Sequence, residues 1–369
     1  MSKHGRVLVA MSGGIDSTVT AMLLHEQGYE VVGITMKTWD YANSGGSKKE
    51  TGCCSLDSIN DARSVSVQMG FPHFIIDIRD EFGDHVIDNF VDEYMAGRTP
   101  NPCVLCNTHI KWSALLKRAD AMDCEFIATG HYARLAQTAA GRWHVRKSAD
   151  DHKDQSYVLW GLSQECMARS RFPLVHMTKP EVRQLAYDWG YEELSKKAES
   201  FEICFVPDND YRGFLKRRMP ELEDRVAGGN YVDKTGRVLG QHEGYPFYTI
   251  GQRKGLGMAF GQPMYVTDID AATNTVTLGE VTDLVRNGMT VGGVTLQKYA
   301  ELPTDGLELL TKVRYKDRGT LARVDQLGPD SLGVEFYADV RGVAPGQSAV
   351  FYEGDDVVGG GLIRSSRTS

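Results

Sequence analysis

The sequence predicts a doubly wound, mainly parallel α/β sheet over residues 1–207, a small central domain over 208–283 and a C-terminal antiparallel β-barrel over 284–369. Up to about residue 205, short apolar runs alternate with helical segments, which is the pattern of an α/β sheet. After Pro207 the pattern changes to hairpin signals and a segment rich in Gly and aromatic residues. From about residue 284, alternating runs follow at short spacing, as in small barrels or sandwiches.

Four apolar runs are the expected strands of the first sheet: Val7–Ala10, Val31–Met36, Phe74–Asp77 and Phe126–Thr129. Helical spacing from Ser17 to Gln27 predicts a helix directly after the first of them. In a doubly wound sheet, ligands bind at the carboxyl ends of the strands. We therefore expect the loop after the first strand, Met36 and Gly130-His131 to share one site. The stretch Asp40–Gly52 is expected to be a mobile loop over it.

The rest of the chain gives a coarser prediction. One short basic helix and a hairpin at Asp233–Gly236 are expected in the central region. The runs that predict barrel strands are Glu308–Tyr315, Thr320–Gln326, Gly333–Tyr337, Ala349–Tyr352 and Val357–Ile363.

Composition excludes some classes of protein. The net charge of −8 argues against a non-specific nucleic-acid binder, which carries a basic footprint. A protein that binds a specific nucleic acid remains compatible with this charge, because the chain has two local basic clusters. Each cluster is also compatible with an ordinary solvated face. The clusters are Arg212, Lys216, Arg217 and Arg218, and Lys312, Arg314, Lys316 and Arg318. No apolar stretch approaches the ~20 residues that span a bilayer, and the N-terminus runs straight into the first strand. We expect a cytoplasmic protein.

The loop Ser12-Gly13-Gly14-Ile15-Asp16-Ser17 lies between the first strand and its helix. Two glycines let successive backbone N–H groups converge on an anion, and the helix N-terminus adds partial positive charge. The lysine of kinase and GTPase phosphate loops is absent, and Asp16 precedes the final serine. This pattern predicts a nucleotide site in which pyrophosphate leaves as a unit and Asp16 places Mg²⁺.

Seven cysteines, an odd number in a reducing compartment, do not form a disulfide framework. The two prolines of Thr99–Asn107 predict a rigid exposed turn, and a helix over Thr108–Arg118 would place Cys106 near its N-terminus, where thiolate is favoured. Cys103 and Cys106 are also compatible with half of a zinc site, a redox dithiol or two structural cysteines. Cys204 lies among apolar residues, so a buried inert thiol is its default interpretation unless another thiol accompanies it.

Together these motifs resemble one family. The loop, Asn101-Pro102-x-x-x-Cys106-Asn107, Thr129-Gly130-His131-Tyr132, Lys153-Asp154-Gln155-Ser156 and Ile203-Cys204-Phe205 occur in the order found in the tRNA-specific 2-thiouridylases of the ATP-pyrophosphatase superfamily. Thr249–Gly257 and Ala344–Gln347 extend the resemblance over essentially the whole chain.

The resemblance implies an enzyme that uses ATP and Mg²⁺ to adenylate the C2 oxygen of the wobble uridine (position 34) of tRNA. Sulfur from a cysteine persulfide then replaces that oxygen, which yields 2-thiouridine, AMP and pyrophosphate. Its partners would be the tRNA anticodon stem-loop and a sulfur-relay or cysteine desulfurase protein. The base is flipped out of its stack to be reached.

The resemblance also implies roles for individual residues. Cys204 would carry the persulfide, and Cys106 would release the sulfur by forming a disulfide with it. The implied nucleotide contacts are Ala10, Met11, Ser12, Gly13, Gly14, Ile15, Asp16, Ser17, Met36 and Gly130. The implied tRNA contacts are Asn101, Pro102 and Cys103 at the target base, with His131, Lys153, Asp154, Gln155, Arg314, Tyr315 and Gln347 elsewhere.

Cys103 departs from the family pattern, because many members have Asp there as a proposed proton carrier. A thiol or a water would take that role here. Alternatively, Cys103, Cys106 and Cys204 supply three thiolates for an Fe–S cluster, as in related tRNA sulfurtransferases. Two other functions compete with thiolation: a small-molecule adenylating ligase, and a nucleotide-sensing tRNA-binding module without enzyme activity.

Overall fold

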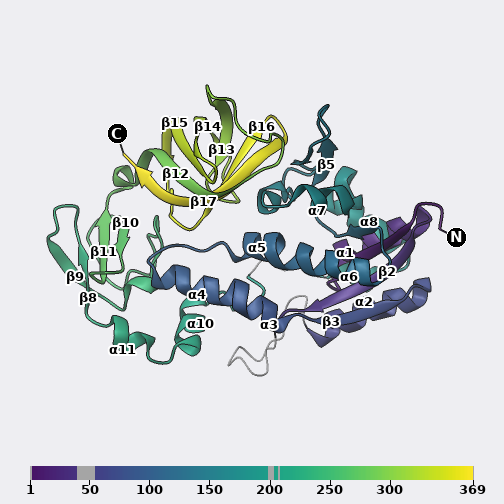
Figure 1. Cartoon of the computed structure of the whole chain (residues 1–369). Helices are drawn as coiled ribbons and strands as arrows, with labels where there is room; N and C mark the ends of the chain where they lie inside the picture. Colours follow the sequence, from purple (N-terminus) through teal and green to yellow (C-terminus); the bar gives the residue numbers. More distant parts are fainter. Residues whose placement is uncertain (1, 40–54, 198–202, 207, 369) are drawn as a thin grey trace. The chain divides into compact units, whose positions relative to one another are not determined.

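The computed structural model describes residues 2–39, 55–197, 203–206 and 208–368 (Figure 1). Contacts divide the chain into two compact units. The first comprises 1–86, 103–210 and 355–357; the second comprises 87–102, 211–354 and 358–369. The predicted loop over 40–52 and the vicinal Cys53-Cys54 lie outside the described residues. Within the described part of the chain, no helix is long and apolar enough to cross a membrane.

The first unit is built on a five-stranded parallel sheet of order β3-β2-β1-β4-β7. Its central strand β1 has three fully buried residues in succession, Val7, Leu8 and Val9, because helices cover both faces of a parallel sheet. The four predicted strands are confirmed, and the two-residue β7 is too short to leave a pattern. The strands are β1 (Arg6–Ala10), β2 (Glu30–Lys37), β3 (His73–Asp77), β4 (Phe126–Ala128) and β7 (Ser170–Arg171).

Helices and one hairpin complete this unit. The predicted helix after β1 is confirmed as α1 (Ile15–Glu26). The others are α2 (Leu56–Met69), α3 (Arg79–Phe82), the π-helix η1 (Gly83–Ile87), α5 (Pro102–Leu105), the π-helix η2 (Cys106–Lys111), α6 (Trp112–Ala121), η3 (Ser156–Leu159), α7 (Gln164–Arg169), η4 (Pro173–His176), α8 (Lys179–Asp188) and α9 (Glu192–Lys196). The hairpin pairs β5 (Arg134–Gln137) with β6 (Trp143–Arg146).

The central part of the second unit is a four-stranded sheet of order β10-β11-β8-β9. The hairpin predicted at Asp233–Gly236 joins β8 to β9, and the predicted basic helix is α10. Tyr211 of α10 stacks on Tyr94 of α4 with ring centroids 4.8 Å apart. The elements are α4 (Asp88–Met95), α10 (Tyr211–Arg218), α11 (Leu222–Val226), β8 (Gly229–Val232), β9 (Val238–His242), η5 (Tyr245–Phe247), β10 (Tyr265–Asp270), β11 (Thr275–Gly279) and η6 (Val281–Leu284).

The remainder of the second unit is a closed antiparallel barrel of six strands. The order β12-β15-β14-β13-β16-β17 closes because β12 also pairs with β17. The five predicted runs are confirmed; β12 was not predicted, since its glycines interrupt the alternation. The strands are β12 (Val285–Leu296), β13 (Leu307–Lys312), β14 (Thr320–Gly328), β15 (Ser331–Arg341), β16 (Ser348–Glu353) and β17 (Asp356–Arg367).

The barrel core predicts a position-specific loss of stability. Phe351 is fully buried in the core, so Phe351→Ala should lower the free energy of unfolding of the barrel by about 3–5 kcal/mol, from lost transfer energy and the residual cavity. Leu321→Ala, at a side chain that is 46% exposed, should cost less than about 1 kcal/mol. Denaturant titrations of both variants test this. Equal losses would contradict the assignment of the core.

Candidate active site

The glycine loop leaves β1 and enters α1 at the carboxyl edge of the parallel sheet. The Ser17 hydroxyl accepts from the Ser12 N–H (3.1 Å) and donates to the Gly14 carbonyl (3.0 Å), so the end of the loop is bonded back to its start. Gly14 is the N-cap residue of α1 and has no side chain that could occupy the first N–H groups of the helix. These N–H groups form the cradle for an anion that the sequence predicts.

Two glycines allow this loop to pack. At Gly13, φ is +67°, and a Cβ would lie 1.9 Å from the Ser58 carbonyl oxygen. A Cβ on Gly130 would lie 2.8 Å from the backbone of Asp16 and from that of Ser17. The segment after β4 therefore lies against the first turn of α1. The structure brings together the predicted nucleotide residues of the loop and Gly130, while Met36 lies near the end of the adjacent β2.

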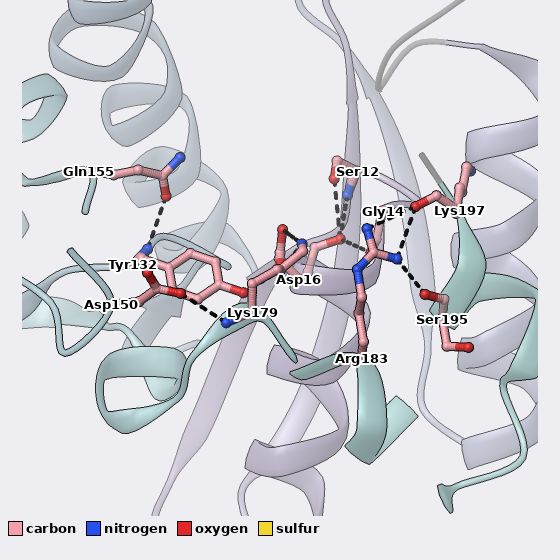
Figure 2. Close-up of polar contacts among 11 residues, drawn as sticks. Ser12, Gly14, Asp16, Tyr132, Asp150, Gln155, Lys179, Arg183, Ser195 and Lys197 are labelled. Atoms are coloured by element: carbon pink, nitrogen blue, oxygen red, sulfur yellow. Dashed lines mark hydrogen bonds and ion pairs between the residues drawn. The ribbon is translucent and has the colours of Figure 1, made fainter. Parts of the chain in front are cut away.

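A lysine reaches this loop from a distant helix. Lys179, the first residue of α8, places its Nζ 2.6 and 2.7 Å from the two carboxylate oxygens of Asp16. The Tyr132 hydroxyl donates to the same carboxylate at 2.7 Å (Figure 2). The Lys179 side chain is only 8% exposed, so its charge is shielded from water, whereas the Asp16 carboxylate stays partly accessible.

Lys179 is not among the site residues that the sequence predicts. The sequence signal next to Lys179 is the capping box of Thr178 and Glu181, which indicates where a helix begins but not which residues the helix contacts.

A second lysine, Lys197, donates to the Gly13 carbonyl at 3.0 Å and pairs with Asp61 at 2.6 Å. The loop itself contains no lysine, but the folded site contains two.

Asp16 is a suitable ligand for Mg²⁺, which prefers carboxylate oxygens, and its side chain is 33% exposed. Among the residues that the structure describes, no group of three or more His, Cys, Asp or Glu side chains is arranged to hold a metal ion. The three thiols of the predicted Fe–S site are not gathered into such a group.

The cysteine turn is helical earlier than predicted. The helical path begins at Pro102 instead of Thr108 and continues through a π-helix into α6. Proline is favoured at the first position of a helix, where its fixed φ fits and its missing N–H is not needed, so Pro102 starts the helix. Cys103 is exposed in the first turn, and Cys106 is buried one turn later.

Cys204 is partly buried, which differs from the fully buried thiol of the default interpretation. The next residue, Phe205, packs edge-on against Phe82 with ring centroids 5.8 Å apart, and its ring is 6.3 Å from that of Trp39. Each of the five described cysteines is present as a thiol. Cys106 and Cys204 belong to the same unit as the glycine loop.

His131 is held as a neutral ring beside this loop. Its Nδ1 lies 2.8 Å from the Thr129 hydroxyl, and the ring packs against those of Trp112 and Phe172. Burial, with a smaller contribution from Lys111, lowers the pKa of His131 from its ordinary 6.5 to about 3. Any contact with RNA at neutral pH would be made by an uncharged imidazole.

The other predicted tRNA residues divide into two kinds. Asp154 and Gln155 shape their own loop, since Asp154 accepts from the Ser148 N–H (3.0 Å) and Gln155 accepts from the Tyr132 N–H (2.9 Å). Arg314 and Tyr315, in the second unit, are exposed after β13.

The fold and the loop define an ATP-pyrophosphatase-type α/β domain followed by a β-barrel. Family models match three successive segments: a tRNA methyl transferase HUP domain over residues 5–208, a tRNA methyl transferase PRC-barrel domain over 212–280 and an aminomethyltransferase beta-barrel domain over 294–363.

Three bacterial relatives, each called tRNA-specific 2-thiouridylase MnmA, match the chain over nearly its full length. The protein of Cytophaga hutchinsonii is 61% identical over 366 residues (99% of each chain), and that of Amoebophilus asiaticus is 62% identical over 364 (99% of this chain, 96% of the relative). The protein of Salinibacter ruber is 56% identical over 365 residues (98% and 95%). The chain belongs to the tRNA-specific 2-thiouridylase family.

The tight approach of Gly130 predicts a selective loss of nucleotide binding. Gly130→Ala places a methyl group against the backbone of Asp16 and Ser17, which must shift, so ATP affinity should fall at least about tenfold. Gly83→Ala is the matched control in the same unit, because a Cβ there meets nothing within 4 Å. Isothermal titration with ATP measures both. Unchanged affinity in Gly130→Ala would show that the loop does not hold the nucleotide.

The lowered pKa of His131 predicts a pH-dependent contribution to stability. Because the folded state disfavours the proton, this contribution is complete above pH 6.5 and is lost as the pH falls from 6.5 toward about 3. The slope approaches ~1.4 kcal/mol per pH unit at most. His131→Gln should therefore lose less stability than the wild type between pH 6.5 and 4 in denaturant titrations. Parallel pH profiles would contradict the assignment.

Proposed function

We propose that this chain is a tRNA uridine 2-sulfurtransferase that adenylates the C2 oxygen of the wobble uridine and replaces it with sulfur. One observation carries the proposal: a phosphate loop and the two cysteines Cys106 and Cys204 occur in one structural unit, in a chain similar over its full length to 2-thiouridylases. We further propose that it acts in the cytoplasm and receives sulfur from a donor protein.

Adenylation comes first because the uracil C2 oxygen is a poor leaving group. That oxygen attacks the α-phosphorus of ATP, and pyrophosphate departs. The N–H groups of the loop and the N-terminus of α1 face the charge that develops on the pyrophosphate. Lys179, paired with Asp16, offsets the negative charge of that carboxylate beside the loop. Bound Mg²⁺, for which Asp16 is the proposed ligand, supplies Lewis-acid stabilisation of the phosphates.

Sulfur transfer follows. The terminal sulfur of a persulfide on Cys204 attacks C2, and AMP leaves with the former C2 oxygen. The Cys106 thiolate then attacks the Cys204 Sγ, which breaks the S–S bond to the base and leaves 2-thiouridine and a Cys106–Cys204 disulfide. An external thiol reductant returns both cysteines to the thiol state seen in the structure.

Cys103 is the proposed site of proton exchange with the target base, directly or through a water. It is exposed in the first turn of α5, next to Asn101 and Pro102, the other proposed contacts of the flipped base. The exposed Arg314 and Tyr315 are proposed contacts to the tRNA backbone and bases, and their loop also carries Lys316 and Arg318.

The direct test is mass analysis of nucleosides from unmodified tRNA incubated with the protein, ATP, Mg²⁺ and a persulfide donor, namely a cysteine desulfurase with free cysteine. The proposal expects 2-thiouridine at position 34, with AMP and pyrophosphate formed in equal amounts only when tRNA is present. Release of AMP and pyrophosphate without any thiolated nucleoside would refute it.

The two-thiol mechanism predicts a sharp effect of serine substitutions. Cys106→Ser and Cys204→Ser should each lower the thiolation rate at least about a thousandfold, because neither hydroxyl can take part in sulfur exchange, while ATP affinity stays unchanged. Cys166→Ser, at a partly buried cysteine of the same unit, is the control with near wild-type rate. Full turnover in either test variant would show the mechanism to be wrong.

The Fe–S alternative has its own test. After anaerobic purification, iron and sulfide analysis should find no stoichiometric cluster if the persulfide route operates. An oxygen-sensitive cluster that turnover requires would overturn that route and favour the three-thiolate site.

A further inference from the structure

Lys197, the residue that follows α9, contacts the phosphate loop through a backbone carbonyl. Its Nζ donates to the Gly13 carbonyl at 3.0 Å and pairs with Asp61 of α2 at 2.6 Å. The same Nζ lies 3.5 Å from the Ser58 hydroxyl, which is also part of α2. All four residues belong to the first unit. One ammonium group therefore joins the loop to the beginning of α2.

The backbone of Lys197 is itself held in place. Its N–H donates to the Leu194 carbonyl at 3.1 Å, at the end of α9. Its carbonyl accepts from both terminal nitrogens of Arg183 at 3.3 Å, and Arg183 also donates to the Ser195 carbonyl (Figure 2). Because Arg183 belongs to α8, the Lys197 side chain starts from a backbone that two helices hold.

The contact with Lys197 sets the direction of the peptide group between Gly13 and Gly14. This peptide bond is trans, and in a trans peptide the C=O and the N–H point in opposite directions. Because the Gly13 carbonyl is directed at Lys197, the Gly14 N–H is directed away from it. Glycines on both sides oppose little steric hindrance to rotation of this peptide, so the bond that holds its carbonyl decides its direction.

The charge of each lysine at the loop is offset by a carboxylate. Lys197 is paired with Asp61, and Lys179 is paired with Asp16. Attraction for pyrophosphate must then come mainly from backbone N–H groups that point at the anion. A cation on a carbonyl also polarises that peptide, which makes its N–H a stronger donor. Lys197 can therefore strengthen the anion site without contacting the anion.

We infer that Lys197 is a positioning residue for adenylation, which holds the Gly13–Gly14 peptide so that the Gly14 N–H faces the pyrophosphate; this rests on the proposed function. Kinase and GTPase loops place their lysine on the phosphates. In this chain a lysine from outside the loop acts through the loop backbone. Direct contact of Lys197 with the phosphates and an effect of its charge alone are the alternatives that the test must separate.

The binding test compares Lys197→Met with the double variant Lys197→Met/Asp61→Asn in isothermal titrations with pyrophosphate and with AMP. Both variants should bind pyrophosphate about tenfold more weakly, because both lose the bond to the Gly13 carbonyl. AMP lacks the β- and γ-phosphates, so its affinity should stay within about twofold of the wild type. Lys196→Met is the matched control with wild-type affinity, because that lysine is 70% exposed and pairs with Glu192 at the surface.

Three binding results would overturn the inference. Wild-type affinity for pyrophosphate in the double variant would show that Lys197 acts through its charge alone. An equal loss of affinity for AMP would show a general disturbance of the site. Unchanged binding of pyrophosphate by Lys197→Met would show that the contact with the loop has no role in holding the anion.

Nuclear magnetic resonance of the ligand-free protein, labelled at glycine, separates positioning from direct contact. The Gly14 amide signal is assigned by its absence in Gly14→Ala. In Lys197→Met, but not in the wild type or Lys196→Met, this signal should show relaxation dispersion, because the released peptide exchanges between orientations. Weaker pyrophosphate binding without dispersion would overturn the inference and make Lys197 a phosphate ligand.

The same measurement keeps the two proposals apart. Failure of the wild type to bind either ATP or pyrophosphate would refute the nucleotide site of the proposed function. Dispersion at the Gly14 amide would still decide whether Lys197 holds the peptide, since it is recorded without any ligand.

Discussion

The ion pair between Asp16 and Lys179 is the interaction on which the arrangement of the candidate site depends. Asp16 lies in the first turn of α1, and Lys179 begins α8, so the pair ties the phosphate loop to a helix far along the chain. Removing Asp16 would leave the buried ammonium group of Lys179 without its partner, which costs more than the pair itself contributes.

The same pair connects the loop to the 150–155 segment. The Lys179 N–H donates to the Asp150 side chain at 3.0 Å (Figure 2). Asp150 also accepts from the Lys153 N–H. By a second route, Tyr132 donates its hydroxyl to Asp16 and its N–H to Gln155. Two chains of hydrogen bonds therefore run from the nucleotide loop to residues proposed to contact tRNA. If residues 150–155 moved when RNA binds, these hydrogen bonds would also shift the Asp16 carboxylate.

The sequence predicted the parallel sheet because its strands are continuous apolar runs, and it predicted the loop because the glycines fall between a strand and a helix. It predicted the barrel strands that alternate cleanly and missed β12, whose glycines conceal the pattern. The positions of Lys179 and Lys197 could not be predicted, since they depend on how α8 and the chain after α9 pack onto α1 and α2. The earlier start of the cysteine helix could have been inferred from Pro102, because proline fits the first helical position. Contacts between residues that are far apart in the sequence cannot be predicted from local sequence patterns.

The pairing of β12 with β17 bears on the order in which the molecule is assembled. A ribosome completes the glycine loop long before it makes β17, which is the last strand of the barrel. Until β17 has emerged, the sheet of the barrel cannot close, and β12 and β16 each keep an unpaired edge. Such an edge is a template for pairing with a strand of another chain. Release of the finished chain and protection of these two edges therefore fall at the same stage of synthesis.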